Sequence, residues 1–229
     1  MLIKIKDQII KDKKIIIASI IAGFVFTASV ALITFMYSER IQGGIADSVL
    51  RFHVRASSDS FEDQLLKMEV KNAVLDSLYG GLPHAETREA AIAYVAKNIV
   101  KITEAAEEAI SSRGLNYPVI AYMTTDFFPT MTYGDITLPP GFYDTLRIDI
   151  GEGLGENWWC VMFPPLCYVD LSVAELPQNE RDALRHVLTS SEYEVISGSI
   201  DDITVRFRVV EWWQNRRSGD SGSTVAVRD

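Results

Sequence analysis

The chain has 229 residues, of which 48% are apolar, and it carries a formal net charge of −9 at neutral pH. This length suits one domain of ordinary size with an appendage. The acidic balance argues against a nucleic-acid-binding protein and gives little attraction to anionic lipid, because both are negatively charged.

The first feature along the chain is an uncharged apolar segment of 23 residues, residues 15–37. As a helix it is about 34 Å long, which is enough to cross a hydrocarbon core of about 30 Å. Residues 1–14 hold five lysines and two aspartates, a net charge of +3. Positive charge before such a segment favours a cytoplasmic N-terminus and export of everything that follows. The exported part then carries −12.

Two interpretations of residues 15–37 stay open, a permanent anchor and a cleaved signal sequence. The segment is longer than the apolar region of about 7–15 residues that is typical of cleaved signals, which favours the anchor. Small residues at 27–29 (TAS) and 44–46 (GIA) are candidate cleavage sites. We expect residues 38–47 to be a short polar linker and residues 48–215 to form one exported domain.

Residues 49–56 (VLRFHVRA) alternate apolar and basic side chains, which predicts a strand with one buried face. The inward set is Leu50, Phe52 and Val54. The outward, basic set is Arg51, His53 and Arg55.

Two helices are predicted next. Ser60 and Asp63 resemble a capping box at the start of the first, and Gly80 and Gly81 end it. Its apolar residues at helical spacing are Phe61, Leu65, Met68, Leu75 and Leu78. The second helix, residues 86–112, has a clear amphipathic face. Pairing as a coiled coil is one possibility for it, and packing on a sheet is the preferred one.

The pattern then changes from helical to extended. Strands are predicted at residues 117–130, 143–150 and 157–163, with an extended segment and a Pro-Pro-Gly turn before the second. A short helix is expected at 179–189, a strand leading into a short helix at 202–215, and a disordered tail at 216–229. This order predicts an α+β domain with two long helices packed on a largely antiparallel sheet.

Residues 157–167 (NWWCVMFPPLC) contain the only cysteines, Cys160 and Cys167. Outside the cytoplasm such a pair can oxidise. The resulting disulfide would close a loop of eight residues, a stabilisation of about 2.5 kcal/mol on the chain-entropy model. Pro164 and Pro165 already restrict this loop. We therefore predict a disulfide and neither a metal site nor a cofactor.

The chain offers only fragments of a catalytic set. His53, Ser57, Ser58 and Asp59 lie close together in sequence, but no G-x-S-x-G motif is present. The preferred interpretation is a strand end followed by a helix cap. The glycines of residues 151–155 precede an aromatic strand and not a helix, so they predict a turn and not a dinucleotide site. The enzyme alternative is an exported hydrolase of cell wall or peptide that uses His53 with Asp59, or a free Cys160.

Three stretches carry a family resemblance: residues 50–78, residues 128–167 and the YVD at 168–170. They resemble the stage II sporulation protein R family, and the stretch from YGDITLP to NWWCVMFPPLC is the most specific. Ser57 stands where the family more often has Asn, and residues 70–72 read VKN where VRD is frequent. The C-terminal tail lies outside the resemblance.

The resemblance implies a signalling role in sporulation and no catalysis. Proteins of this family are made in the forespore and lie in its membrane or in the intermembrane space. There they activate a membrane-bound aspartic protease of the mother cell, of the stage II sporulation protein GA type. That protease removes the pro-sequence of sigma-E.

Two surfaces are candidates for contact with the protease. The first is the rigid Cys160–Cys167 ring with its flank: Tyr133, Gly134, Asp135, Asn157, Trp158 and Trp159. A preordered loop loses less entropy on binding. The second is the basic set Arg51, His53 and Arg55. A different class of function is a structural, membrane-anchored module that bridges the septum.

Overall fold

The computed structural model describes residues 2–167 and 175–198, with side chains from residue 13 onward. The chain divides into two compact units, one ending at Gly43 and the other beginning at Gly44. The strand and helix expected at 202–215 and the tail expected at 216–229 lie outside the described residues.

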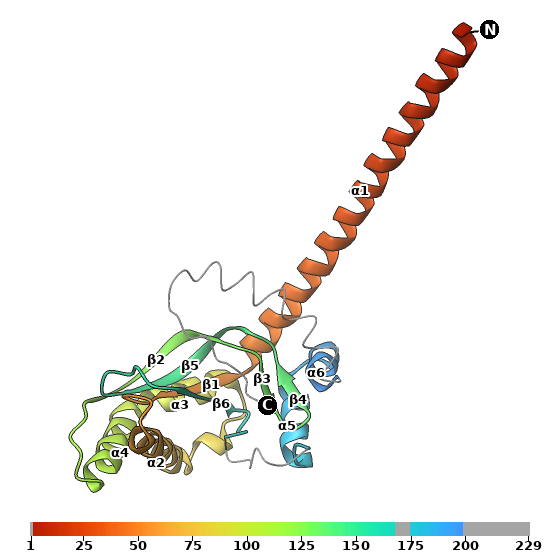
Figure 1. Cartoon of the computed structure of the whole chain (residues 1–229). Helices are drawn as coiled ribbons and strands as arrows, with labels where there is room; N and C mark the ends of the chain where they lie inside the picture. The colour runs from red at the N-terminus through yellow and green to blue at the C-terminus, as the bar shows by residue number, and fades with distance from the viewer. Residues whose placement is uncertain (1, 168–174, 199–229) are drawn as a thin grey trace. The chain divides into compact units, whose positions relative to one another are not determined.

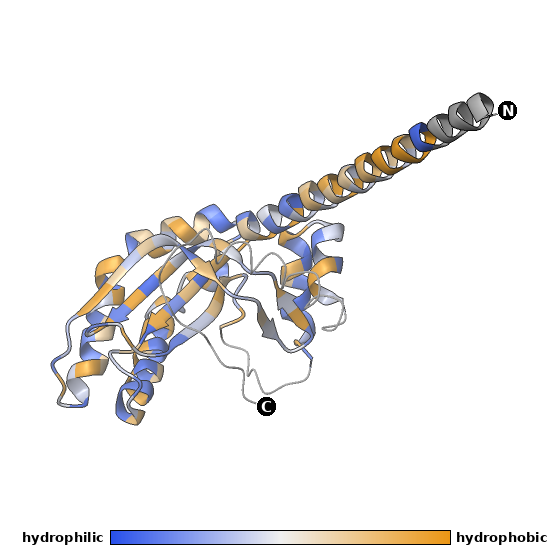
Figure 2. Cartoon of the chain, turned by 45° about the horizontal axis from the view of Figure 1, so that its top comes forward, coloured by the Kyte–Doolittle hydropathy of each residue, from blue (hydrophilic) through white to orange (hydrophobic). Residues whose placement is uncertain are grey.

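Helix α1 (Leu2–Ser48) is continuous and includes residues 38–47, which were expected as a linker. Its apolar stretch is exposed along its length (Figure 2). From Lys13 the helix is long and apolar enough to cross a membrane, a property that signal sequences share. Near its end Ile45 is fully buried, so the last turns of α1 belong to the second folded unit.

The second unit contains a mixed four-stranded sheet in the order β2-β5-β1-β6 (Figure 1). Its strands are β1 (Leu50–Arg55), β2 (Val119–Phe128), β5 (Gly141–Ile150) and β6 (Asn157–Phe163). β1 and β5 are parallel, and the two outer pairings are antiparallel. A separate hairpin joins β3 (Met131–Tyr133) to β4 (Ile136–Leu138). The predicted α+β class is confirmed.

The remaining elements are helical. They are α2 (Phe61–Leu78), the short 3-10 helix η1 (Leu82–His84), α3 (Arg88–Lys97), α4 (Ile99–Ser112), α5 (Gln178–Val187) and α6 (Ser190–Ser197). The prediction of one helix over residues 86–112 is wrong, because Asn98 leaves the helical conformation. The Asn98 side-chain amide donates to the Tyr94 carbonyl at 2.7 Å, which gives the break a local hydrogen bond.

Helices α2, α3 and α4 pack with one face of the sheet around the hydrophobic core. Phe52 and Val54 point into this core, as their alternation predicts. Helix α2 buries Leu66, Val70, Val74, Leu75 and Leu78. The predicted inward face of α2 is therefore wrong for Phe61, Leu65 and Met68, which are 77%, 40% and 37% exposed. Apolar residues at helical spacing lie on two sides of α2, and the side that packs into the core is the one formed by buried residues between Leu66 and Leu78.

Adjacent leucines of α2 provide a direct test of this assignment. Leu66 is 2% exposed and Leu65 is 40% exposed. We expect Leu66→Ala to lower the free energy of unfolding by about 2–5 kcal/mol, because it leaves a cavity in the core. Leu65→Ala should change it by less than about 1 kcal/mol. Urea titration of both variants measures the difference, and equal losses would contradict the assigned core.

Candidate functional site

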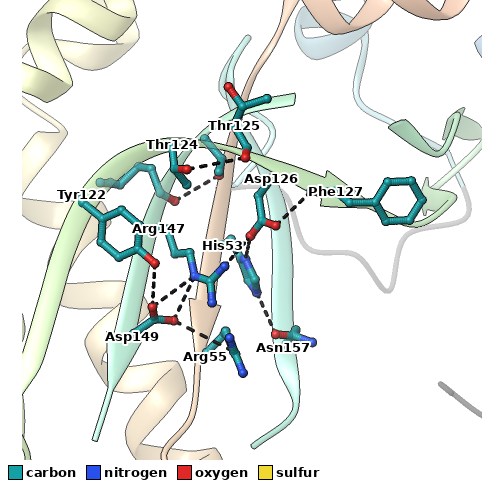
Figure 3. A network of polar contacts seen from close by, with 12 residues as sticks. His53, Arg55, Tyr122, Thr124, Thr125, Asp126, Phe127, Arg147, Asp149 and Asn157 are labelled. Carbon is teal, nitrogen blue, oxygen red and sulfur yellow. Dashed lines mark hydrogen bonds and ion pairs between the residues drawn. The ribbon is translucent and has the colours of Figure 1, made fainter. Parts of the chain in front are cut away.

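The face of the sheet opposite α2 and α4 carries polar and aromatic side chains. Strand register places His53 between Arg147 of β5 and Trp159 of β6, and places Arg147 beside Tyr122 of β2. We call this set the polar face: His53, Arg55, Tyr122, Asp126, Arg147, Asp149, Asn157 and Trp159. Most of its polar members are joined by hydrogen bonds and ion pairs (Figure 3).

His53 is the centre of the polar face. Its Nδ1 lies 2.9 Å from Asp126 Oδ2, and its Nε2 lies 2.7 Å from Asn157 Oδ1. The imidazole stacks on the Trp159 ring with centroids 3.7 Å apart. Its side chain is only 3% exposed. The outward, accessible position predicted for His53 is therefore wrong, and His53 instead fixes the positions of Asn157 and Trp159.

Arg147 extends the network across β5. Its Nη1 lies 2.8 Å from Asp126 Oδ2, and its Nε lies 3.0 and 3.1 Å from the two carboxylate oxygens of Asp149. Tyr122 donates its hydroxyl proton to Asp149 at 2.8 Å, and Arg55 approaches the same carboxylate at 4.0 Å. Two carboxylates thus hold the cations of neighbouring strands in fixed positions.

This packing shifts the pKa values of Asp126 and Tyr122. Burial alone would raise the pKa of Asp126, but the hydrogen bond and charge of His53, the charge of Arg147 and the Phe127 N–H together lower it. The pKa of Tyr122 is raised, first by burial and then by its hydrogen bond to Asp149. The ionised form of Asp126 is therefore part of the folded state.

Arg51 does not belong to the accessible surface, and the prediction that it faces outward is wrong. It is fully buried, with Nε donating to the Cys160 carbonyl and Nη2 to the Tyr133 hydroxyl, both at 3.0 Å. Its guanidinium lies 4.2 Å from the Phe128 ring centroid and 5.0 Å from that of Tyr143. Arg51 therefore connects β1 to β6 and to the β3–β4 hairpin.

The turn of that hairpin faces α5. Gly134 has a positive φ of 60° and lies so close to the Leu176 backbone that a side chain would not fit. Asp135 accepts a hydrogen bond from the Leu176 N–H at 2.9 Å and pairs with Arg181 at 2.8 Å. Tyr133 is buried. Tyr133, Gly134 and Asp135 were predicted to contact the protease, but their contacts in the described part of the chain are with other residues of the same domain.

The predicted disulfide joins Cys160 to Cys167. Of the eight residues in its ring, only Pro165 is not buried. The two tryptophans before it point to opposite faces of the sheet. The centroids of the Trp158 and Phe52 rings are 5.8 Å apart, and Lys71 lies over the Trp158 ring. Trp159 lies on the polar face. Most of the ring therefore packs inside the domain. The partly exposed residues of the first predicted surface are Gly134, Asp135, Asn157, Trp158, Trp159 and Pro165.

The pairs proposed for a hydrolase are not assembled. The carboxylate beside His53 is that of Asp126, whereas Asp59 accepts the Glu156 N–H at 2.7 Å. Cys160 is bonded to Cys167 and holds no free thiol. The described side chains include no group of three or more His, Cys, Asp or Glu residues suited to a metal ion.

Sequence reasoning missed Tyr122, Asp126, Arg147 and Asp149. A signal for two of them was present, because Arg147 and Asp149 alternate with the apolar residues of β5. Their link to Asp126 and Tyr122 depends on the pairing of β5 with β2, which no local pattern specifies.

Comparison with known proteins gives the family. A model of the stage II sporulation protein R family matches residues 46–173, which is more than half of the chain. The chain belongs to this family. Stage II sporulation protein R of Bacillus subtilis strain 168 is 31% identical over 181 residues, which cover 73% of this chain and 81% of that protein. No solved structure matches.

The sequence resemblance is thereby confirmed, and this family member is a sporulation protein. The matched range contains the whole polar face, from His53 to Trp159, and both cysteines. The site described above therefore lies within the part of the chain that the family shares.

The lowered pKa of Asp126 predicts how the network responds to acid. Its stabilising contribution is present above the ordinary aspartate value of 3.8 and is lost as pH falls through the lower folded value. Asp126→Asn should therefore reduce stability at neutral pH and flatten the acid side of the stability profile. Urea titrations across this pH range measure both effects, with the exposed Glu107→Gln as control. An unchanged acid slope in Asp126→Asn would contradict the assigned ion pairs.

Proposed function

We propose that this chain is an exported signalling protein of sporulation that activates a membrane-bound aspartic protease, which then removes the pro-sequence of sigma-E. The observation that carries the proposal is membership of the stage II sporulation protein R family. The candidate membrane-spanning or signal helix and the disulfide both suit a domain that works outside the cytoplasm.

The polar face is the surface that we assign to the protease. It combines Trp159, Tyr122 and Arg55, the residue types that are enriched where partners bind most strongly. These side chains are partly exposed, yet most are already held by neighbours, as Trp159 is held by His53. Binding then costs little side-chain entropy, because these positions are set before the partner arrives.

The activating step is a shift of population. A ligand moves a two-state equilibrium only by its difference in affinity for the two states. The polar face therefore binds the active form of the protease more tightly than the resting form. This role requires no proton transfer or covalent bond from the chain itself.

Variants of the polar face test this assignment. We expect Arg55→Glu and Trp159→Ala to reduce sigma-E processing by about tenfold or more, as truncation of strong interface residues does. The assay is co-expression of the exported chain, the protease and the pro-sigma-E substrate in a heterologous bacterium, followed by immunoblotting.

The matched control is Phe142→Ala, an exposed aromatic of β5 whose neighbour Tyr143 is buried on the other side of the strand. Arg55 is 31% exposed, so Arg55→Glu keeps the core intact if Trp159→Ala does not fold. Full processing by the folded, exported Arg55→Glu variant would refute the assignment of the polar face.

The role of α1 separates a signalling ligand from a structural module. We expect a chain in which residues 1–37 are replaced by a cleavable signal peptide to support processing, since the folded unit from Gly44 remains complete. The same co-expression assay measures the result. Loss of processing with the exported domain folded would favour a module that must be anchored to bridge the septum.

A further inference from the structure

The outer edge of β2 is a part of the sheet that the described chain leaves unpaired. β2 is the last strand on its side of the sheet (Figure 1), and among the described strands only β5 pairs with it. All ten residues of β2 pair with β5 in one continuous register. A strand of this length at an edge presents a row of backbone N–H and C=O groups to a further strand.

Hydrogen bonds at the two ends of β2 identify the residues that form this row. In an antiparallel pair, alternate residues direct both backbone groups to the neighbouring strand, and the residues between them direct theirs away. The Gly151 N–H donates to the Pro118 carbonyl at 2.8 Å, so the even-numbered residues of β2 bond to β5. The odd-numbered residues therefore face outward. In agreement, the N–H of Phe127 donates to the Asp126 side chain at 2.9 Å and not to β5.

The first half of this edge is the part that suits a further strand. The outward backbone groups of Val119, Ala121 and Met123 have no hydrogen-bond partner in the described part of the chain. Residues 119–125 (VIAYMTT) contain no charge and no proline, the features that usually prevent strand addition at an edge. Ile120, in the same section, is 60% exposed. The edge is therefore apolar, uncharged and, within the described residues, open.

The opposite edge of the sheet, formed by β6, is protected in ways that β2 is not. The pairing of β6 with β1 shifts its register between Leu50 and Arg51. β6 ends at Phe163, and the next residues are Pro164 and Pro165 inside the disulfide ring. A register shift, prolines and a ring all hinder the addition of a further strand. The two edges of the sheet therefore differ, and β2 is the edge suited to pairing.

We propose that β2 pairs with β2 of a second copy of this chain, in an antiparallel arrangement centred on Ala121. This inference does not depend on the proposed function. In that register Val119 lies opposite Met123 of the second copy, and Ala121 lies opposite Ala121. All the outward N–H and C=O groups of these residues then have partners. Because the same edge serves both copies, the contact is closed and the assembly stops at two copies.

The side chains in this register complement each other. Side chains approach most closely at residue pairs that share no hydrogen bond, and at these pairs Ile120 lies opposite Tyr122 of the second copy. A β-branched residue beside an aromatic ring is a favourable cross-strand pair, and it covers the exposed Ile120. Asp126 is the only charged residue of β2 and lies outside the paired section. The section therefore brings no like charges together.

Pairing through β2 extends one sheet across both copies. The twofold axis that relates two antiparallel edge strands is perpendicular to the sheet, so the two polar faces lie on the same side. Tyr122 lies at the border of its own polar face, where its hydroxyl donates to Asp149. Arg55 and Trp159 lie on β1 and β6, away from this edge. The interface therefore leaves the two residues assigned to the protease test outside the contact.

Cross-linking of the full chain in detergent tests the register. We expect Ala121→Cys to form a disulfide-linked dimer on oxidation, because the two residues 121 meet with Cα atoms about 5.5 Å apart. Thr125→Cys, exposed on the same edge, is the matched control. It should stay monomeric, because the two residues 125 lie at opposite ends of the paired section. Linkage of Ala121→Cys no faster than that control would overturn the proposal.

Sedimentation of the same detergent-solubilised chain tests the hydrogen bonds of the pair. Ala121→Pro removes an N–H that β5 does not use, so each copy should stay folded. Dimerisation should weaken by about tenfold or more, because both hydrogen bonds at the centre of the pair are lost. Ala121→Ser keeps the N–H and should sediment as wild type. Circular dichroism measures whether each variant is folded.

The outcomes separate a second copy from other occupants of the edge. A wild-type chain that is monomeric throughout would overturn the proposal, as would a folded Ala121→Pro chain that dimerises as wild type. If the wild-type chain is monomeric and Ala121→Pro alone abolishes sigma-E processing, the edge binds a strand of the protease instead. Loss of processing by Arg55→Glu with the dimer intact concerns the polar face and leaves the β2 pairing in place.

Discussion

The buried guanidinium of Arg51 is the contact on which the arrangement of the second unit depends. A charge taken out of water is costly unless hydrogen bonds and polarisable neighbours compensate it. Arg51 meets part of this requirement with the Cys160 carbonyl, the Tyr133 hydroxyl and the Phe128 ring, while its Nη1 is buried with no hydrogen-bond partner among the described residues. These partners come from β6, the hairpin and the end of β2. Folding of β1 with its charge buried therefore requires all three to assemble together.

The same constraint organises the polar face. Because Arg51 and His53 lie on one side of β1, closure of the hairpin over Arg51 leaves His53 at the border of the covered region. There it meets Asp126, Asn157 and Trp159. The disulfide lies at the other end of β6 and holds the chain that follows this strand. A buried cation, a disulfide and an ion-pair network thus support one partly exposed surface.

Much of this could be predicted from local patterns. Alternation predicted β1, the change to an extended pattern predicted β2, β5 and β6 close to their observed bounds, and export with two cysteines predicted the disulfide. The burial of Arg51 under the β3–β4 hairpin could not be predicted, because its hairpin partner Tyr133 lies 82 residues away in the sequence. The ambiguity of α2 has a similar origin. Both of its apolar series have helical spacing, and only the sheet decides which one enters the core.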